Sequence, residues 1–124
     1  SGGLSNVQVS VAQAGLDLLL ADPSCVNDLS NVSRSFVEDL TKAGFRLTPT
    51  VSPIVPLLCR SEDEVWEMCT RSRKRGLLIS PAVHPEVPKD KPRIRVCLTA
   101  SHSKDDLDFA EQTLIEVGKE IGLI

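Results

Sequence analysis

The sequence predicts an α+β fold, with a mainly antiparallel four-stranded sheet and helices packed on one of its faces. Helical periodicities and strand-like runs alternate along the 124 residues in the order α-α-β-β-α-β-β-α. No crossover helix separates the members of each strand pair, which favours antiparallel pairing. The length suits one domain that can bury roughly two-thirds of its unfolded surface.

Two helices are expected first, over residues 5–21 and 24–43. In the first, apolar residues recur at helical spacing: Val7, Val11, Ala14 and Leu18. Asp22-Pro23 ends it, because the residue before a proline avoids the α region. This helix has few charges, so we expect it to be buried, either as a core helix or against an interface. Gly44 suits the left-handed cap that ends the second helix.

Two strands and a third helix follow. Residues 45–50 predict a short strand, and residues 54–60 predict another. Pro56 cannot donate to a ladder, so the second strand is expected at an edge or with a bulge. Ser61 begins the third helix, with Glu64 at capping-box spacing, and Gly76 ends it.

The remaining elements are two strands and a helix. Residues 77–80 predict a third strand. Residues 81–92 contain four prolines and predict a stiff, extended loop. A fourth strand is expected over residues 92–102, and Ser103 with Asp106 forms a capping box that begins the last helix.

The strand over residues 92–102 has two unlike faces. One face is apolar: Ile94, Val96, Leu98 and Ala100. The other carries Arg93, Arg95, Cys97 and Thr99. A guanidinium offers a planar fork of donors that matches a carboxylate or a phosphate. Either these are arginines on an ordinary solvated face, or this face meets an anion or another domain.

Composition narrows the class of protein. Hydrophobic residues make up 41% of the chain, charged residues 25%, and the net charge is −3. The negative charge argues against nucleic-acid binding, and no apolar run approaches the roughly 20 residues of a membrane span. The N-terminus shows no signal-peptide pattern. Four cysteines without paired or metal-binding spacing predict buried, reduced thiols and a cytoplasmic location.

Motifs for catalysis are scarce. His84 and His102 have no metal-ligating partner at a suitable spacing, and the chain has no Walker A, G-x-S-x-G or G-x-G-x-x-G motif. Cys97 lies on the cationic face, but no base is placed beside it by the sequence. We therefore expect no catalytic residue, no metal site and no bound cofactor within this chain.

Several short motifs together carry a family resemblance. In chain order they are Ala43-Gly44-Phe45, Ser52-Pro53-Ile54-Val55-Pro56, Gly76-Leu77-Leu78-Ile79, Pro85-Glu86-Val87-Pro88, Arg93-Ile94-Arg95, Thr99-Ala100-Ser101-His102-Ser103 and Asp106-Leu107-Asp108. Their order and spacing resemble the C-terminal end of the α-oxoamine synthases of pyridoxal-phosphate fold type I. That family includes 8-amino-7-oxononanoate synthase, 2-amino-3-ketobutyrate CoA ligase and serine palmitoyltransferase.

The resemblance implies a domain and a role for one residue. Residues 5–124 would be the small C-terminal domain, and residues 1–4 are interpreted as a tag or linker. The second arginine of the family's R-x-R motif holds the α-carboxylate of the amino-acid substrate, and that position is Arg95 here. His102 matches the family's A-x-H segment, and we assign it a structural role before a chemical one.

The resemblance also implies what lies elsewhere. In the family, pyridoxal 5'-phosphate is bound through a Schiff-base lysine of a larger upstream domain, and none of the six lysines here stands in a matching motif. Leu4-Ser5-Asn6-Val7-Gln8 stands where the family has a serine-rich stretch ending in prolines, so contacts from there to the cofactor phosphate are not carried over.

The chain is therefore interpreted as an excised domain or a split subunit of a homodimeric, decarboxylating acyl-CoA:amino-acid C-acyltransferase. It would need the large domain, an amino acid and an acyl-CoA or acyl carrier, and would be inert alone. The alternative is a free-standing regulatory or partner-binding module.

Overall fold

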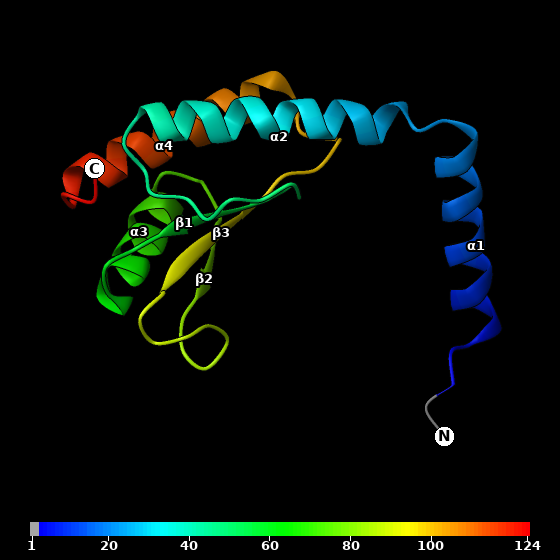
Figure 1. Cartoon of the computed structure of the whole chain (residues 1–124), viewed down its shortest axis with the longest axis horizontal. Helices are drawn as coiled ribbons and strands as arrows, with labels where there is room; N and C mark the ends of the chain where they lie inside the picture. The colour runs from blue at the N-terminus through cyan, green and yellow to red at the C-terminus, as the bar shows by residue number, and fades with distance from the viewer. Residues whose placement is uncertain (1–2) are drawn as a thin grey trace.

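The structure, a computed structural model, describes residues 3–124 (Figure 1). Of the residues interpreted as a tag or linker, the first two lie outside the described residues, and Gly3 and Leu4 precede the first helix. The elements follow in the order α1 (Asn6–Ala21), α2 (Ser24–Lys42), β1 (Ile54–Leu58), α3 (Glu62–Lys74), β2 (Ser80–Ala82), β3 (Arg93–Cys97) and α4 (Lys104–Glu120). The α+β class is confirmed.

The sheet has three strands in the described residues, in the order β1-β3-β2, and both pairings are antiparallel. β3 is central, with Arg95 opposite Pro56 of β1 and Ser80 of β2. β1 lies at the edge of this sheet, as its proline predicts. The prediction of four strands was wrong.

The missing strand is the segment at residues 45–50, which pairs with β1 only at one isolated bridge, between Leu47 and Leu57. Two backbone bonds flank it, from the Leu58 amide to the Arg46 carbonyl (2.8 Å) and from the Thr48 amide to the Pro56 carbonyl (3.3 Å). The ladder stops there because Pro56 has no N–H to return to Thr48. A proline on the partner strand therefore truncated the expected strand.

The strand expected at residues 77–80 is also displaced, because β2 begins at Ser80. The end of α3 uses the preceding amides: Gly76 donates to the Arg73 carbonyl, and Leu77 donates to the Ser72 carbonyl, each over 3.0 Å. Gly76 has a φ of +94°, which suits this left-handed helix end. β2 therefore starts after the residues whose amides bond to the end of α3. It includes Pro81 and Ala82, which were expected in the loop.

The core lies between the inner face of the sheet and the helices α2, α3 and α4. β1 and β3 contribute alternate residues, and the helices contribute their apolar stripes. The apolar side chains with no exposed surface are Leu40, Val55, Leu57, Val65, Met68, Ile94, Leu114 and Val117. The other face of β3 is open, so the helices pack on one face of the sheet.

The predicted helix starts hold, with one difference. Ser103 and Asp106 form the expected capping box at the start of α4. At α3, the Ser61 hydroxyl accepts from the Glu64 amide, but the Glu64 carboxylate bonds to Arg60 instead of completing the box. Arg60 also donates to the Gly122 carbonyl over 2.8 Å, so Arg60 connects Glu64 of α3 to the end of the chain.

α1 stands apart from the rest of the molecule (Figure 1). Within the described residues α1 has no buried residue. It is therefore not a core helix of this chain, and of the two expectations only a helix at an interface remains. α1 and α2 meet at an angle of 79°. No single described helix is long and apolar enough to cross a membrane. Only α1 and α2 taken together, across their bend, have the length and apolar composition of a span.

Candidate functional site

β3 presents Arg95 on the open face of the sheet. Burial alternates along the strand: Ile94 and Val96 are buried, whereas Arg95 and Cys97 are exposed. The residues opposite Arg95 in the two neighbouring strands, Pro56 and Ser80, carry no charge. Among residues 3–124, the Arg95 guanidinium has no ion-pair or hydrogen-bond partner. Its fork of donors is therefore available to a ligand.

Arg93 lies on the same face, two residues earlier, and is held differently. It is half-buried, and its Nε donates to the Lys91 carbonyl over 3.1 Å. This bond fixes the guanidinium against its own backbone. The structure thus separates the two arginines that the sequence placed together, and Arg95 is the freer of them.

His102 and Cys97 come together in one groove of about 380 Å³ between the end of β3 and α4. The Thr99 amide donates to Nδ1 of His102 over 3.2 Å, and the His102 amide donates to the Thr99 carbonyl over the same distance. The imidazole therefore holds the turn between β3 and α4, which is the structural role expected for it. Two exposed apolar residues, Leu78 and Phe109, also line this groove. Sequence reasoning missed it because its walls come from three separate segments.

The four cysteines are free, and only some are buried. Cys59 is buried, and burial raises the pKa of its thiol to about 12, so this group is a poor nucleophile. Cys69 is half-buried, and burial raises its pKa too. Cys25 and Cys97 are exposed, so the expectation of four buried thiols was wrong for these two. Within residues 3–124, no cluster of three or more His, Cys, Asp or Glu residues could hold a metal ion.

The lysines of this chain are not held as a Schiff-base lysine usually is. All six are exposed. Lys42 bonds to Asp39, and Lys104 bonds to Asp108, and each carboxylate raises the pKa of its lysine. A lysine that forms a Schiff base is usually desolvated so that its pKa falls, which is the opposite situation. The described residues therefore do not fit a complete cofactor site.

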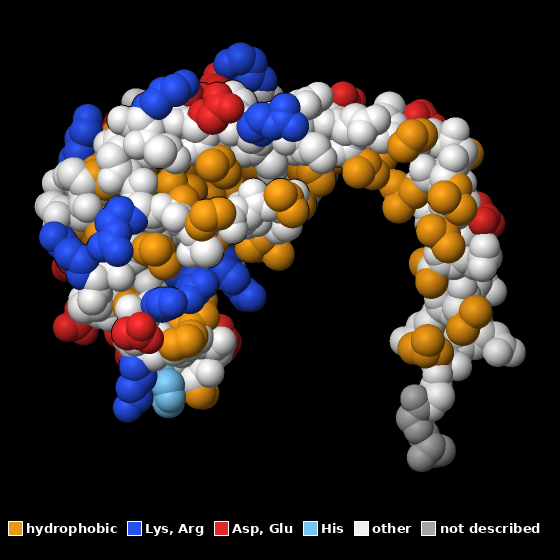
Figure 2. Space-filling view, viewed as in Figure 1, with side chains coloured by type: hydrophobic (Ala, Val, Ile, Leu, Met, Phe, Trp, Pro, Cys, Tyr) orange, Lys and Arg blue, Asp and Glu red, His pale blue; other side chains and the backbone are white. Residues whose placement is uncertain are grey.

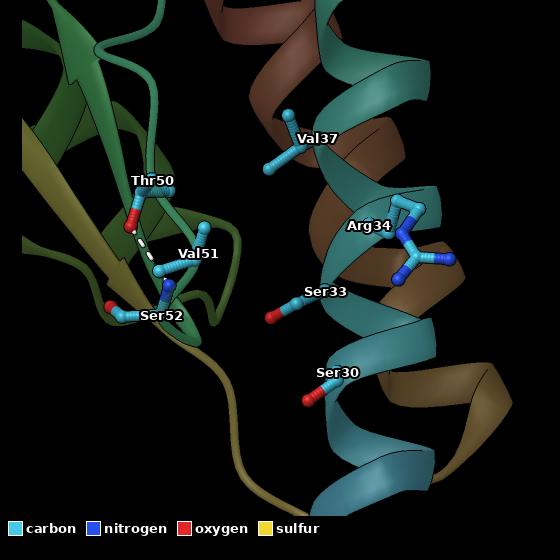
Figure 3. Close-up of a pocket in the computed structure, with 7 residues that line it drawn as sticks. All are labelled: Ser30, Ser33, Arg34, Val37, Thr50, Val51 and Ser52. Carbon is cyan, nitrogen blue, oxygen red and sulfur yellow. Dashed lines mark hydrogen bonds between the residues drawn. The ribbon is translucent and has the colours of Figure 1, made fainter.

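A small cleft of about 190 Å³ lies between α2 and the loop before β1 (Figure 3). Ser33 points from α2 towards this loop, and its buried Oγ has no hydrogen-bond partner among the described residues. On the loop, Thr50 Oγ1 accepts from the Ser52 amide over 3.1 Å. Arg34 turns away from the cleft in Figure 3. The cleft thus offers hydroxyls without a facing charge, which suits an ordered water better than an anion.

Curated proteins match the chain over its whole length. An 8-amino-7-oxononanoate synthase of Petrotoga mobilis is 32% identical over 124 residues, which is 100% of this chain and 32% of that protein. The mitochondrial 2-amino-3-ketobutyrate coenzyme A ligase of Homo sapiens is 31% identical over 124 residues, or 100% of this chain and 30% of that protein. The chain therefore spans about a third of the length of these relatives. No protein-family model matches it.

Solved structures show the same fold. A serine palmitoyltransferase from S. paucimobilis superposes with a TM-score of 0.92 at 22% identity, covering 100% of this chain and 32% of that chain. The 8-amino-7-oxononanoate synthase of Francisella tularensis gives a TM-score of 0.78 at 15% identity, covering 98% of this chain and 35% of that one. In both cases the matched region is a minor part of a longer chain.

Proposed function

The chain belongs to the α-oxoamine synthase family, and we propose that it is the part of such an enzyme that binds the carboxylate of the amino-acid substrate. The parent would be a pyridoxal-phosphate-dependent acyltransferase that condenses an amino acid with an acyl thioester and releases CO2. The observation that carries this proposal is the exposed guanidinium of Arg95, without a partner among residues 3–124, at the centre of the open sheet face.

The geometry of β3 supports a clamp at this position. The strand is held on both sides by antiparallel neighbours, and its inner face is fixed in the core by Ile94 and Val96. A rigid strand gives the Arg95 side chain a fixed origin. A bidentate guanidinium–carboxylate pair then supplies orientation as well as affinity, and orientation contributes much to a condensation between two bound substrates.

The rest of the enzyme would supply the other groups. All six lysines are exposed and none stands in a motif that matches the family's Schiff-base lysine, so in this proposal the larger remaining part binds the cofactor. When bound, pyridoxal phosphate withdraws electrons from the amino acid and allows its carboxylate to leave. The acyl-CoA or acyl-carrier substrate, the homodimeric parent and the inertness of the lone chain belong to this proposal. The cytoplasmic location also remains a proposal, consistent with four free cysteines.

The test is Arg95→Ala in the full-length parent enzyme. Charge-assisted hydrogen bonds contribute roughly 1.5–3 kcal/mol, so the KM for the amino acid should rise about 10- to 100-fold. The KM for the acyl thioester should stay unchanged. Arg73→Ala is the matched control, because Arg73 is also exposed and without an ion-pair partner among the described residues, but lies in the last turn of α3. Unchanged amino-acid kinetics in Arg95→Ala would refute the clamp.

The isolated chain tests where the cofactor binds. Titration of the 124 residues with pyridoxal phosphate should give no stoichiometric change in the absorbance of the cofactor. A saturable change would contradict the assignment of the cofactor lysine to the missing part. Tight binding of an unrelated ligand or partner by the lone chain would instead favour a free-standing module.

A further inference from the structure

α1 is an apolar helix that its own chain leaves uncovered. It has no buried residue, and several of its large apolar side chains are mostly exposed, with fractions of 73% for Val7, 67% for Val11 and 72% for Leu18. Asp17 is its only charged residue. A helix of this composition is normally buried, because the surface it exposes to water is unfavourable.

The apolar residues of α1 form two stripes. Val7, Val11, Ala14 and Leu18 form the first stripe, and Val9, Leu16 and Leu20 form the second. At 3.6 residues per turn, the two stripes lie on roughly opposite sides of the helix. The polar residues between them also follow helical spacing: Asn6, Ser10, Gln13 and Asp17. Both stripes are exposed, so each needs a partner of its own.

We propose that α1 is an interior helix of the other domain of the parent enzyme, covered on both stripes by parts of that polypeptide outside these 124 residues. This rests on the proposed function only in requiring a larger enzyme. The serine palmitoyltransferase of S. paucimobilis matches this chain over its full length, including α1, with a TM-score of 0.92, although its chain is about three times as long. The position of α1 away from the sheet is therefore found in a protein that has the additional chain to cover it.

The two apolar stripes of α1 favour burial in a protein domain over binding to a membrane surface. A helix lying on a bilayer has one apolar face and a strongly charged opposite face. α1 has apolar stripes on both sides and one acidic charge, which fits enclosure within a protein. Figure 2 shows apolar side chains of α1 on the side that faces the open space beside the rest of the molecule. That space is where a second domain would lie.

With α1 assigned to the other domain, the boundary of this domain lies between α1 and α2. The sequence suggested one unit over residues 5–124, whereas the core of the structure begins within α2, where Phe36 is buried and Leu29 packs against the core. The chain bends by 79° between α1 and α2, at Asp22-Pro23. Residues 24–124 are thus the folding unit of this domain, and α1 folds with its neighbour.

Hydrogen exchange on the 124-residue chain tests the first half of this inference. Amides of α1 should be protected less than about tenfold, whereas amides near Leu40 and Leu114 should be protected more than about a thousandfold. Protection of α1 comparable to that of α4 in a monomer would show that α1 packs on its own chain. The same protection in a dimer would show that the occupant is a second copy. Either result would overturn the proposal.

Glutamate substitutions in the full-length enzyme test the second half. Leu18→Glu in the first stripe and Leu16→Glu in the second should each reduce the yield of folded enzyme at least about tenfold, as expected for a charge buried without a partner. Ser10→Glu, in the polar strip of the same helix, should leave the yield unchanged. In the 124-residue chain, all three variants should melt at the wild-type temperature, because α1 contributes no burial there.

Two results would contradict burial of α1 in the parent. One is a wild-type yield with either stripe substituted. The other is binding of the full-length enzyme to vesicles of phosphatidylcholine and phosphatidylglycerol that Leu18→Glu abolishes. The carboxylate clamp can fail separately, because Arg95→Ala is read from amino-acid KM in a folded enzyme, whereas the α1 variants are read from folding.

Discussion

The two faces of β3 show a division between residues that hold the fold and residues left free to bind. Ile94 and Val96 on the inner face are buried beneath the helices, whereas Arg95 and Cys97 on the outer face are exposed. Both sets sit on one five-residue strand, so the same backbone fixes them. An exposed cation on a rigid strand costs the fold little, and the strand gives its side chain a fixed origin. The difference predicts that inner substitutions change stability and outer substitutions change binding.

The largest effect on stability is expected at Ile94, whose side chain has no exposed surface. Ile94→Ala should lower the free energy of unfolding by about 2–5 kcal/mol, because it removes buried methyl groups and leaves a cavity. Urea denaturation of the 124-residue chain measures this. Arg95→Ala is the matched control on the opposite face and should stay within about 0.5 kcal/mol of wild type. Equal losses from the two variants would break the division between the faces.

A smaller loss is expected where the core has no room for a single methyl group. A Cβ at Gly118 of α4 would lie 2.8 Å from Cζ of the buried Phe45 and 3.2 Å from Cγ1 of Ile124. Gly118→Ala should therefore destabilise the chain by about 1–3 kcal/mol from overpacking, less up to about 1 kcal/mol of gained helix propensity. Gly15→Ala in α1, where a Cβ meets nothing within 4 Å, is the control and should not destabilise. A more stable Gly118→Ala would contradict the packing described.

The smallest effect is expected from the ion pair at the start of α3. Burial raises the pKa of Glu64, but hydrogen bonds from Arg60 outweigh it and lower the pKa overall. Because the folded pKa is depressed, the carboxylate stabilises the fold above its unfolded pKa, about 4.3, and loses this contribution as the pH falls through the folded value.

Glu64→Gln should accordingly destabilise the chain by about 1 kcal/mol at pH 7. The difference from wild type should shrink below about pH 4. Urea denaturation at pH 7, 5 and 3.5 measures it. A difference that stays constant with pH would show that the charge of Glu64 contributes nothing.

The sequence was sufficient for elements defined by local chemistry. The Ser103–Asp106 box and the spacing of Leu114 and Val117 located α4, and alternation located β3 with Arg95 outward. These patterns depend on neighbours within a few residues. The Arg95 clamp itself came from the family resemblance and remains a prediction.

The sequence did not predict structural features that depend on contacts with a distant segment. The strand expected at residues 45–50 was limited by Pro56 of its partner, and β2 was delayed by helix-end bonds to Ser72 and Arg73. The groove that joins Cys97 to His102 could not be foreseen for the same reason. Our proposal for α1 concerns contacts with chain outside these 124 residues, and periodicity within α1 cannot reveal such contacts.

The most direct test compares an amino acid with its carboxamide in the full-length enzyme. The amino acid would be the one that the full-length enzyme turns over fastest in a screen of the common amino acids. Wild type and Arg93→Ala should bind the carboxylate form at least about tenfold more tightly than the amide, as a charge-assisted pair predicts. Arg95→Ala should bind both forms equally. If Arg95→Ala kept the wild-type preference for the carboxylate, Arg95 would not be the clamp.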